Sequence, residues 1–222
     1  MMQLVDRVEK RRFIGREFVL WLWFESEIFE ATLHTKEQGD FGLWIEKEIL
    51  LSAGAETTRI KGSTPAHARE AKEALSLGKM PERASFRVSL GEREASFSLK
   101  AEPLSLSSLS LPTVLGGEDE PAPGELGAPK QGRPKMRRST VEQDAERDRD
   151  NQAEAFYERM MLTREIEALI EALYRDFLAL RLSDSWDASV VPVLRTWVRG
   201  KSVDADAYRA VRSRATKRKN KA

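Results

Sequence analysis

Apolar residues are most concentrated near the start of the chain, where residues 18–24 form an unbroken apolar run flanked by charged residues. The run contains Trp21 and Trp23, and it is far shorter than the roughly 20 apolar residues that a membrane-spanning helix needs. Together with Ile14, its spacing predicts a helix over residues 1–26 whose second half is buried on nearly all sides. Gly15 lies inside this helix and indicates either a close packing point or a helix start just after it.

The next part of the chain changes to the alternating pattern of a β-strand. Residues 41–45 alternate, and apolar residues resume at 49–51 after a charged triplet, so a hairpin is predicted between the two segments. A further short strand is predicted over residues 57–61. A helix rich in Ala, Glu and Lys follows over residues 65–77, because Pro suits a first helical turn and a Gly comes directly after its end.

The clearest hairpin in the sequence joins residues 85–90 to residues 95–101, which both alternate strictly on either side of a turn at Gly91. Leucines alternate again over residues 104–111, but the pair Ser107 and Ser108 adds one residue to the register. That extra residue predicts a β-bulge or a change of face in this segment.

The second half of the chain predicts a linker followed by helices. Residues 116–140 hold Gly, Pro and charge with almost no large apolar side chain, which predicts disorder. Apolar residues then recur at intervals of three and four over residues 162–180 and again over 186–197, where Pro192 must kink or interrupt the second helix. Such a helical hairpin buries too little surface alone, and the opening aromatic helix is a candidate for the missing third element.

These patterns together predict an α+β fold with a small, mainly antiparallel sheet. The predicted boundaries are residues 1–112 for the α+β domain, 113–140 for the disordered linker, 141–200 for the helical hairpin and 201–222 for a basic tail.

The amino-acid composition limits the possible functions of the chain more than its possible folds. The chain has no cysteine, which excludes disulfides and thiolate–metal sites and is compatible with a reducing compartment. Its start lacks the basic-then-apolar order of a secretory signal, so we expect a cytoplasmic protein that does not enter a membrane. His34 and His67 have no metal-ligand partner at a recognised spacing, and no phosphate-binding glycine loop is present. We therefore expect no catalytic residues, no metal and no cofactor.

The net charge of +1 conceals two basic segments that contain no acidic residue. They consist of Lys130, Arg133, Lys135, Arg137 and Arg138 in the linker, and of Arg209, Arg212, Arg214, Lys217, Arg218, Lys219 and Lys221 near the end of the chain. Such segments are typical of flexible arms that neutralise phosphates without recognising sequence. Basic ends that only solubilise a protein have the same composition, and both explanations stay open.

Residues 13–24 (Phe-Ile-Gly-Arg-Glu-Phe-Val-Leu-Trp-Leu-Trp-Phe), with the pattern and order of segments over residues 59–111, resemble the C-terminal part of the recombination-associated protein RdgC family. The resemblance implies a non-catalytic protein that forms a ring-shaped dimer around duplex DNA and restrains recombinase filaments. The positions that it marks as DNA contacts are Arg59, Lys61, Arg87 and Lys100.

The family is longer than this chain, and the helices after residue 141 have no counterpart in it. We therefore expect a double-stranded DNA-binding accessory protein of recombination or replication, located at the nucleoid, with a second copy or a partner supplying the missing N-terminal portion. The alternative is a protein–protein interaction module or subunit whose basic tails only solubilise it.

Overall fold

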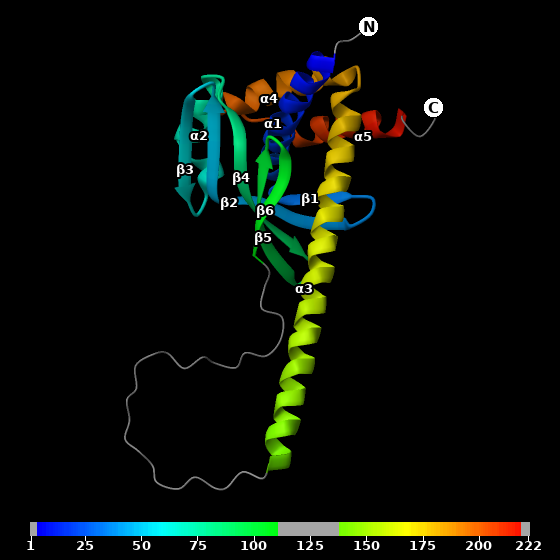
Figure 1. The fold of residues 1–222 in the computed structure, drawn as a ribbon. Helices are drawn as coiled ribbons and strands as arrows, with labels where there is room; N and C mark the ends of the chain where they lie inside the picture. The colour runs from blue at the N-terminus through cyan, green and yellow to red at the C-terminus, as the bar shows by residue number, and fades with distance from the viewer. Residues whose placement is uncertain (1–3, 111–137, 219–222) are drawn as a thin grey trace. The chain divides into compact units, whose positions relative to one another are not determined.

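The computed structural model describes residues 4–110 and 138–218, and describes the side chains of residues 14–110 and 153–214. Contacts between residues divide the chain into two units, one made of residues 1–110 with 167–222 and one of residues 111–166. The first unit contains the sheet and most of the helices (Figure 1). Helix α3 (Arg138–Arg181) begins in the second unit and ends in the first.

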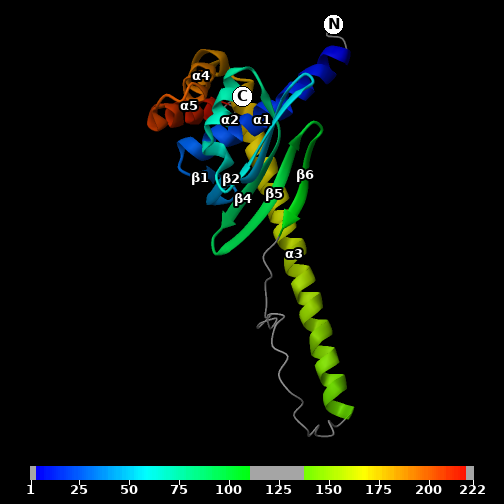
Figure 2. The ribbon, with the colours of Figure 1, turned by 90° about the vertical axis from the view of Figure 1, so that its left-hand side faces the viewer.

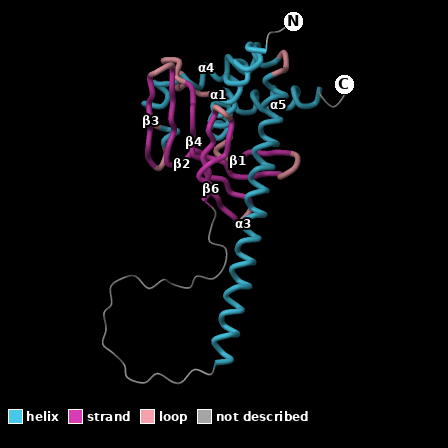
Figure 3. Tube along the Cα trace, in the orientation of Figure 1, coloured by secondary structure: helices cyan, strands magenta, loops and turns pink. Residues whose placement is uncertain are grey.

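The first unit is built on an antiparallel sheet of six strands, which confirms the predicted α+β class (Figure 3). The strands are β1 (Thr32–Thr35), β2 (Gly39–Ala53), β3 (Glu56–Gly62), β4 (Met80–Leu90), β5 (Arg93–Ala101) and β6 (Leu104–Ser110). Their order is β1-β2-β4-β5-β6, and β3 pairs with β2 as well. The predicted hairpin is β4–β5, and the register shift between β5 and β6 confirms the predicted bulge.

Strand β2 corrects the prediction of a hairpin between residues 41–45 and 49–51. The two segments belong to one strand, which pairs with β4 on both sides of a register shift between Ile45 and Ile49. Lys47 has a positive φ of 68° at this point. This bulge accommodates the charged residues between the two segments, and Ile45 and Ile49 on either side of it both face the core. Strand β1 was not predicted.

Five helices and two short helical turns complete the described chain. They are α1 (Leu4–Ile28), a 3₁₀ turn (Pro65–His67), α2 (Arg69–Ser76), α3, a π-helical turn (Trp186–Val190), α4 (Val191–Val198) and α5 (Ala205–Arg218). The π-helical turn directly before α4 confirms the interruption predicted at Pro192. The expectation of a flexible arm near the end of the chain is wrong for residues 205–218, which form α5. Among the described residues, no helix has the length and apolarity needed to cross a membrane.

Helix α1 lies at the centre of the first unit. One side contacts β2, β4 and β5, and the aromatic side chains of residues 18–24 contact the C-terminal helices. The Phe18 and Phe177 ring centroids are 5.4 Å apart, and those of Phe24 and Trp197 are 5.5 Å apart. The prediction that the opening helix supplies the third element of the helical packing is therefore confirmed.

Gly15 allows α1 to approach the sheet closely. A Cβ atom added at this position would lie 2.0 Å from the backbone oxygen of Ala101 on β5, which is far inside van der Waals contact. Since α1 begins at Leu4, Gly15 is not a helix start, and its role is that of the close packing point.

The substitution Gly15→Ala should destabilise the protein by about 1–3 kcal/mol, although alanine favours helix by about 1 kcal/mol. The added methyl group meets backbone that cannot rotate away, so α1 must shift. Gly62→Ala is the matched control, because no atom lies within 4 Å of a Cβ there. Urea denaturation measures both, and equal free energies of unfolding for the two variants would contradict the close contact.

Candidate nucleic-acid interface

Cationic side chains gather on the face of the sheet that points away from α1. Directly opposed residues in antiparallel strands point to the same face, and the register aligns one row across the sheet. The row runs from β3 to β6 through Arg59, Leu50, Arg83, Lys100 and Ser105. The strands β2, β4, β5 and β6 that carry most of this row lie next to one another in Figure 2.

Parallel rows on the same face add hydroxyl groups and one aromatic ring. We call this surface the open face, and its residues are Trp44, Glu46, Glu48, Leu50, Arg59, Lys61, Arg83, Ser85, Arg87, Ser89, Glu94, Ser96, Ser98, Lys100, Ser105 and Ser107. All of them are partly or fully exposed, whereas the alternating residues on the opposite face form the core. The open face therefore offers serine hydroxyls and cations over the width of the sheet.

Carboxylates neutralise part of this positive charge. Glu48 binds Arg59 and Arg83, with 2.7 Å between Arg83 Nη2 and Glu48 Oε1. Desolvation by itself would raise the pKa of Glu48, but the hydrogen bonds from the two arginines outweigh it and lower that pKa. Arg87 binds Glu94 and Glu46 in the same way, and hydrogen bonding to Glu94 raises the pKa of Arg87.

The remaining positive charge of the open face comes from its lysines. Lys61 and Lys100 are exposed, and within residues 14–110 and 153–214 no side chain forms an ion pair with either. The face thus carries five cationic side chains, the three arginines and these two lysines, against the carboxylates of Glu46, Glu48 and Glu94.

The structure places on one face the four sheet residues for which the family resemblance implies DNA contacts. Arg59, Lys61, Arg87 and Lys100 come from three strands and share the open face. Sequence reasoning missed Arg83, although extending the alternation of Arg87 back by four residues leads to it.

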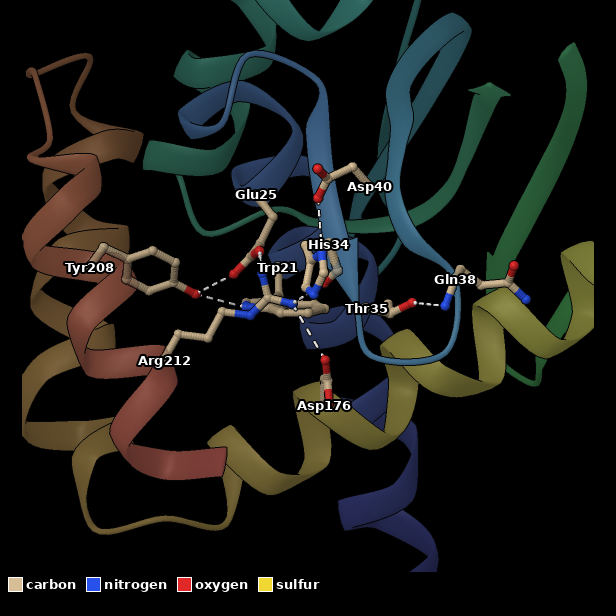
Figure 4. A network of polar contacts seen from close by, with 9 residues as sticks. All are labelled: Trp21, Glu25, His34, Thr35, Gln38, Asp40, Asp176, Tyr208 and Arg212. Atoms are coloured by element: carbon tan, nitrogen blue, oxygen red, sulfur yellow. Dashed lines mark hydrogen bonds and ion pairs between the residues drawn. The ribbon is translucent and has the colours of Figure 1, made fainter. Parts of the chain in front are cut away.

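Arg212 does not belong to a solvated tail. It lies in a buried polar network with Trp21, Glu25, Asp176 and Tyr208 (Figure 4). Trp21 Nε1 donates to the Tyr208 hydroxyl at 2.9 Å, and that hydroxyl donates to Glu25 Oε1 at 2.6 Å. Arg212 Nη1 lies 2.7 Å from Glu25 Oε2, and Asp176 lies 3.5 Å from the same guanidinium group. The network joins α1, α3 and α5.

The other predicted basic residues are placed only in part. Arg214 is exposed on α5. Arg138, Lys217 and Arg218 lie in helices, but their side chains are outside the described set. The residues that lie outside the described chain altogether are Lys130, Arg133, Lys135, Arg137, Lys219 and Lys221.

Burial sets the electrostatics of the network around Tyr208. Glu25 is completely buried, and desolvation raises the pKa of its carboxyl, although the Arg212 charge and the Tyr208 hydrogen bond oppose this rise. Desolvation and the Glu25 carboxylate also raise the pKa of Tyr208 well above its ordinary value. Tyr208 therefore stays protonated and donates its hydrogen bond throughout the neutral range, which makes the network a structural one.

The substitution Tyr208→Phe should lower the free energy of unfolding by about 1–3 kcal/mol, because it leaves the buried Trp21 N–H without an acceptor and Glu25 Oε1 without a donor. Urea denaturation monitored by tryptophan fluorescence measures the change. Tyr157→Phe is the control, since Tyr157 is 58% exposed. Equal stability of the two variants would show that the network contributes nothing.

A second polar cluster fixes α2 against α1 and α4. Glu27 accepts hydrogen bonds from Trp23 Nε1 at 2.6 Å and from Trp197 Nε1 at 2.7 Å, and it lies 2.8 Å from Lys72 Nζ. The ammonium group also lies 3.2 Å from the centroid of the Trp197 ring. Desolvation nevertheless lowers the pKa of Lys72 from 10.5 to about 8, because it exceeds the attraction to Glu27.

Lys72 should make stability depend on pH above neutrality. Between pH 8 and 10.5 the unfolded chain retains this proton and the folded chain releases it, so the free energy of unfolding rises with pH across the window. Relative to Lys72→Met, the wild-type protein should gain up to about 3 kcal/mol between these limits. Urea denaturation of both proteins at several pH values tests this, and parallel pH profiles would contradict it.

The described residues hold no group of three or more His, Asp or Glu side chains that could bind a metal ion. His34 and His67 are exposed, and His34 Nδ1 lies 2.8 Å from Asp40 Oδ1.

Comparisons of the chain with models of protein families, with curated proteins and with solved structures find no match. The open face is thus the candidate site that the described side chains support best.

Proposed function

We propose that this protein is a non-catalytic accessory protein of recombination or replication that binds double-stranded DNA without sequence preference through the open face. The observation that carries the proposal is the gathering of Arg59, Lys61, Arg87 and Lys100 on one exposed surface of the sheet. The resemblance to the RdgC family implies DNA contacts at these same four positions. Arg83 adds a fifth cation between them.

The dimensions of the open face suit a DNA backbone. Adjacent strands are about 4.8 Å apart, so the row from Arg59 to Ser105 spans about 19 Å. A duplex carries one phosphate per roughly 1.7 Å of its axis, so several phosphates would face this row. Arginine and serine groups bind phosphate oxygens through hydrogen bonds that do not depend on the base, which supports binding without sequence readout.

The single aromatic ring of the open face favours duplex over single-stranded DNA. Single-strand binders use exposed rings on which bases stack. Trp44 is half-buried, it lies against Gly42, and the Arg87 guanidinium is 5.8 Å from its centroid. Its face is therefore occupied, and the open face offers cations and hydroxyls rather than a stacking platform.

The same proposal includes the assembly and the location. The protein would act in the cytoplasm at the nucleoid, as a homodimer or with a partner protein. The basic segments of the linker and of the chain end would add further phosphate contacts that strengthen binding and its dependence on salt.

Neutralising the lysines of the open face tests the proposal on the full-length chain. Lys61→Gln with Lys100→Gln should weaken binding to short duplexes and lower the slope of log K against log salt by roughly 2, because two phosphate contacts are lost. Fluorescence anisotropy between about 50 and 200 mM salt, with two duplexes of unrelated sequence, measures both quantities.

The control is Lys36→Gln with Lys201→Gln, which removes the same charge from exposed positions elsewhere in the unit. A third variant, with Lys217, Arg218, Lys219 and Lys221 changed to glutamine, measures the contribution of the chain end. Equal losses in the first two variants would exclude the open face as the binding surface. The absence of any binding at low salt would reject the proposed function itself.

A further inference from the structure

An apolar pocket lies on the helical side of the first unit. It has a volume of about 410 Å³ and lies between α1, α2, α4 and the π-helical turn before α4. Its apolar lining includes Leu20, Leu75, Met80, Trp186, Leu194 and Val198. This volume is in the range of sites that take small ligands or anchoring side chains, and π-helical turns within helices are frequent at functional sites.

The rim of this pocket carries positive charge without a counter-charge. Glu17 lines the pocket, but its carboxylate is bound by Arg181, with 2.7 Å between Oε2 and Arg181 Nε. Arg195 on α4 and Arg199, the residue that caps the C-terminal end of α4, also line the pocket and are exposed, four residues apart in sequence. Within the part of the chain whose side chains are described, neither arginine forms an ion pair. Two like charges at this spacing repel each other in the unbound protein, so an anion beside them would be stabilised.

One exposed leucine directly follows residues that line the pocket, and a second follows the ion-pair partner of a lining residue. Leu77 follows the pocket-lining Leu75 and Ser76 and is 77% exposed. Leu182 follows Arg181, the partner of Glu17, and is also 77% exposed. Large apolar side chains that remain in water around a concave apolar surface mark sites where another molecule binds.

We propose that this pocket docks a short peptide segment of a partner protein, in which acidic residues flank one or two large apolar side chains. The apolar side chain enters the pocket, and the acidic residues pair with Arg195 and Arg199. Arginine binds carboxylates through two parallel hydrogen bonds, which gives such an interface direction as well as affinity. A nucleic acid fits less well, because its phosphates would meet the two arginines while the apolar lining stayed unfilled.

The probe for this site is a fluorescein-labelled peptide of sequence Glu-Asp-Leu-Phe-Asp-Glu, titrated with the full-length protein. Two altered peptides separate the contributions: one has Ser in place of Leu and Phe, and one has amides in place of the acids. The protein variant is Arg195→Gln with Arg199→Gln, which changes only exposed side chains. Arg159→Gln with Arg164→Gln is the matched control, because these arginines of α3 are also exposed.

The proposal expects at least roughly tenfold weaker binding by the Arg195/Arg199 variant and by both altered peptides, with the control variant unchanged. Undiminished binding of the serine peptide would show attraction by charge alone and would overturn the proposal. Undiminished binding by the Arg195/Arg199 variant, or no binding of the parent peptide, would also overturn it. Direct binding of a labelled oligonucleotide, lost in the Arg195/Arg199 variant but kept in the Lys61/Lys100 variant, would assign the pocket to nucleic acid instead. None of these outcomes depends on DNA binding by the open face.

Discussion

Burial of α1 on two sides is the constraint on which the rest of the first unit depends. One side lies on the sheet at the Gly15–Ala101 contact, and the aromatic residues of the other side need a cover that the first 110 residues do not provide. Residues 167–214 supply that cover. Glu25 makes the packing of these residues on α1 specific, because a buried carboxylate without a cationic partner costs several kcal/mol. Arg212 on α5 meets that requirement from 187 residues away in sequence.

The spacing of apolar residues along the chain predicted the helices and strands whose formation depends on that spacing alone. The apolar run of residues 18–24 and the strict alternation of β4 and β5 identified the central helix and the main hairpin, because burial alone determines both. The continuity of β2 was missed because a residue with positive φ, Lys47, lies where a turn was equally consistent with the sequence. Helix α5 was missed because its stability comes from Tyr208 and Arg212, whose partners are distant in sequence and leave no periodic signal.

The candidate site, too, could be predicted only as far as local patterns determine it. Alternation placed Arg87 and Lys100 on the polar side of a hairpin, but only the register from β3 to β5 shows that Arg59 and Arg83 lie in one row with Lys100. Basic composition also grouped residues with different roles. Arg212 stabilises the fold, whereas the lysines of the open face carry charge that no described side chain compensates. The net charge of the chain therefore says little about where a polyanion would bind.

The two proposed surfaces lie on different layers of the unit. The open face is the outer side of the sheet, whereas the apolar pocket is formed mainly by α1, α2 and α4 with the π-helical turn. Strand β4 contributes to both, through Met80 to the pocket and through Arg83 and Arg87 to the face. Coupling between two sites requires an element with two arrangements of similar energy, whereas β4 is paired with β2 and β5 and packs against α1. We therefore expect that filling the pocket leaves the arginines of the open face in place, so that the two proposed partners, a peptide and DNA, would not exclude each other.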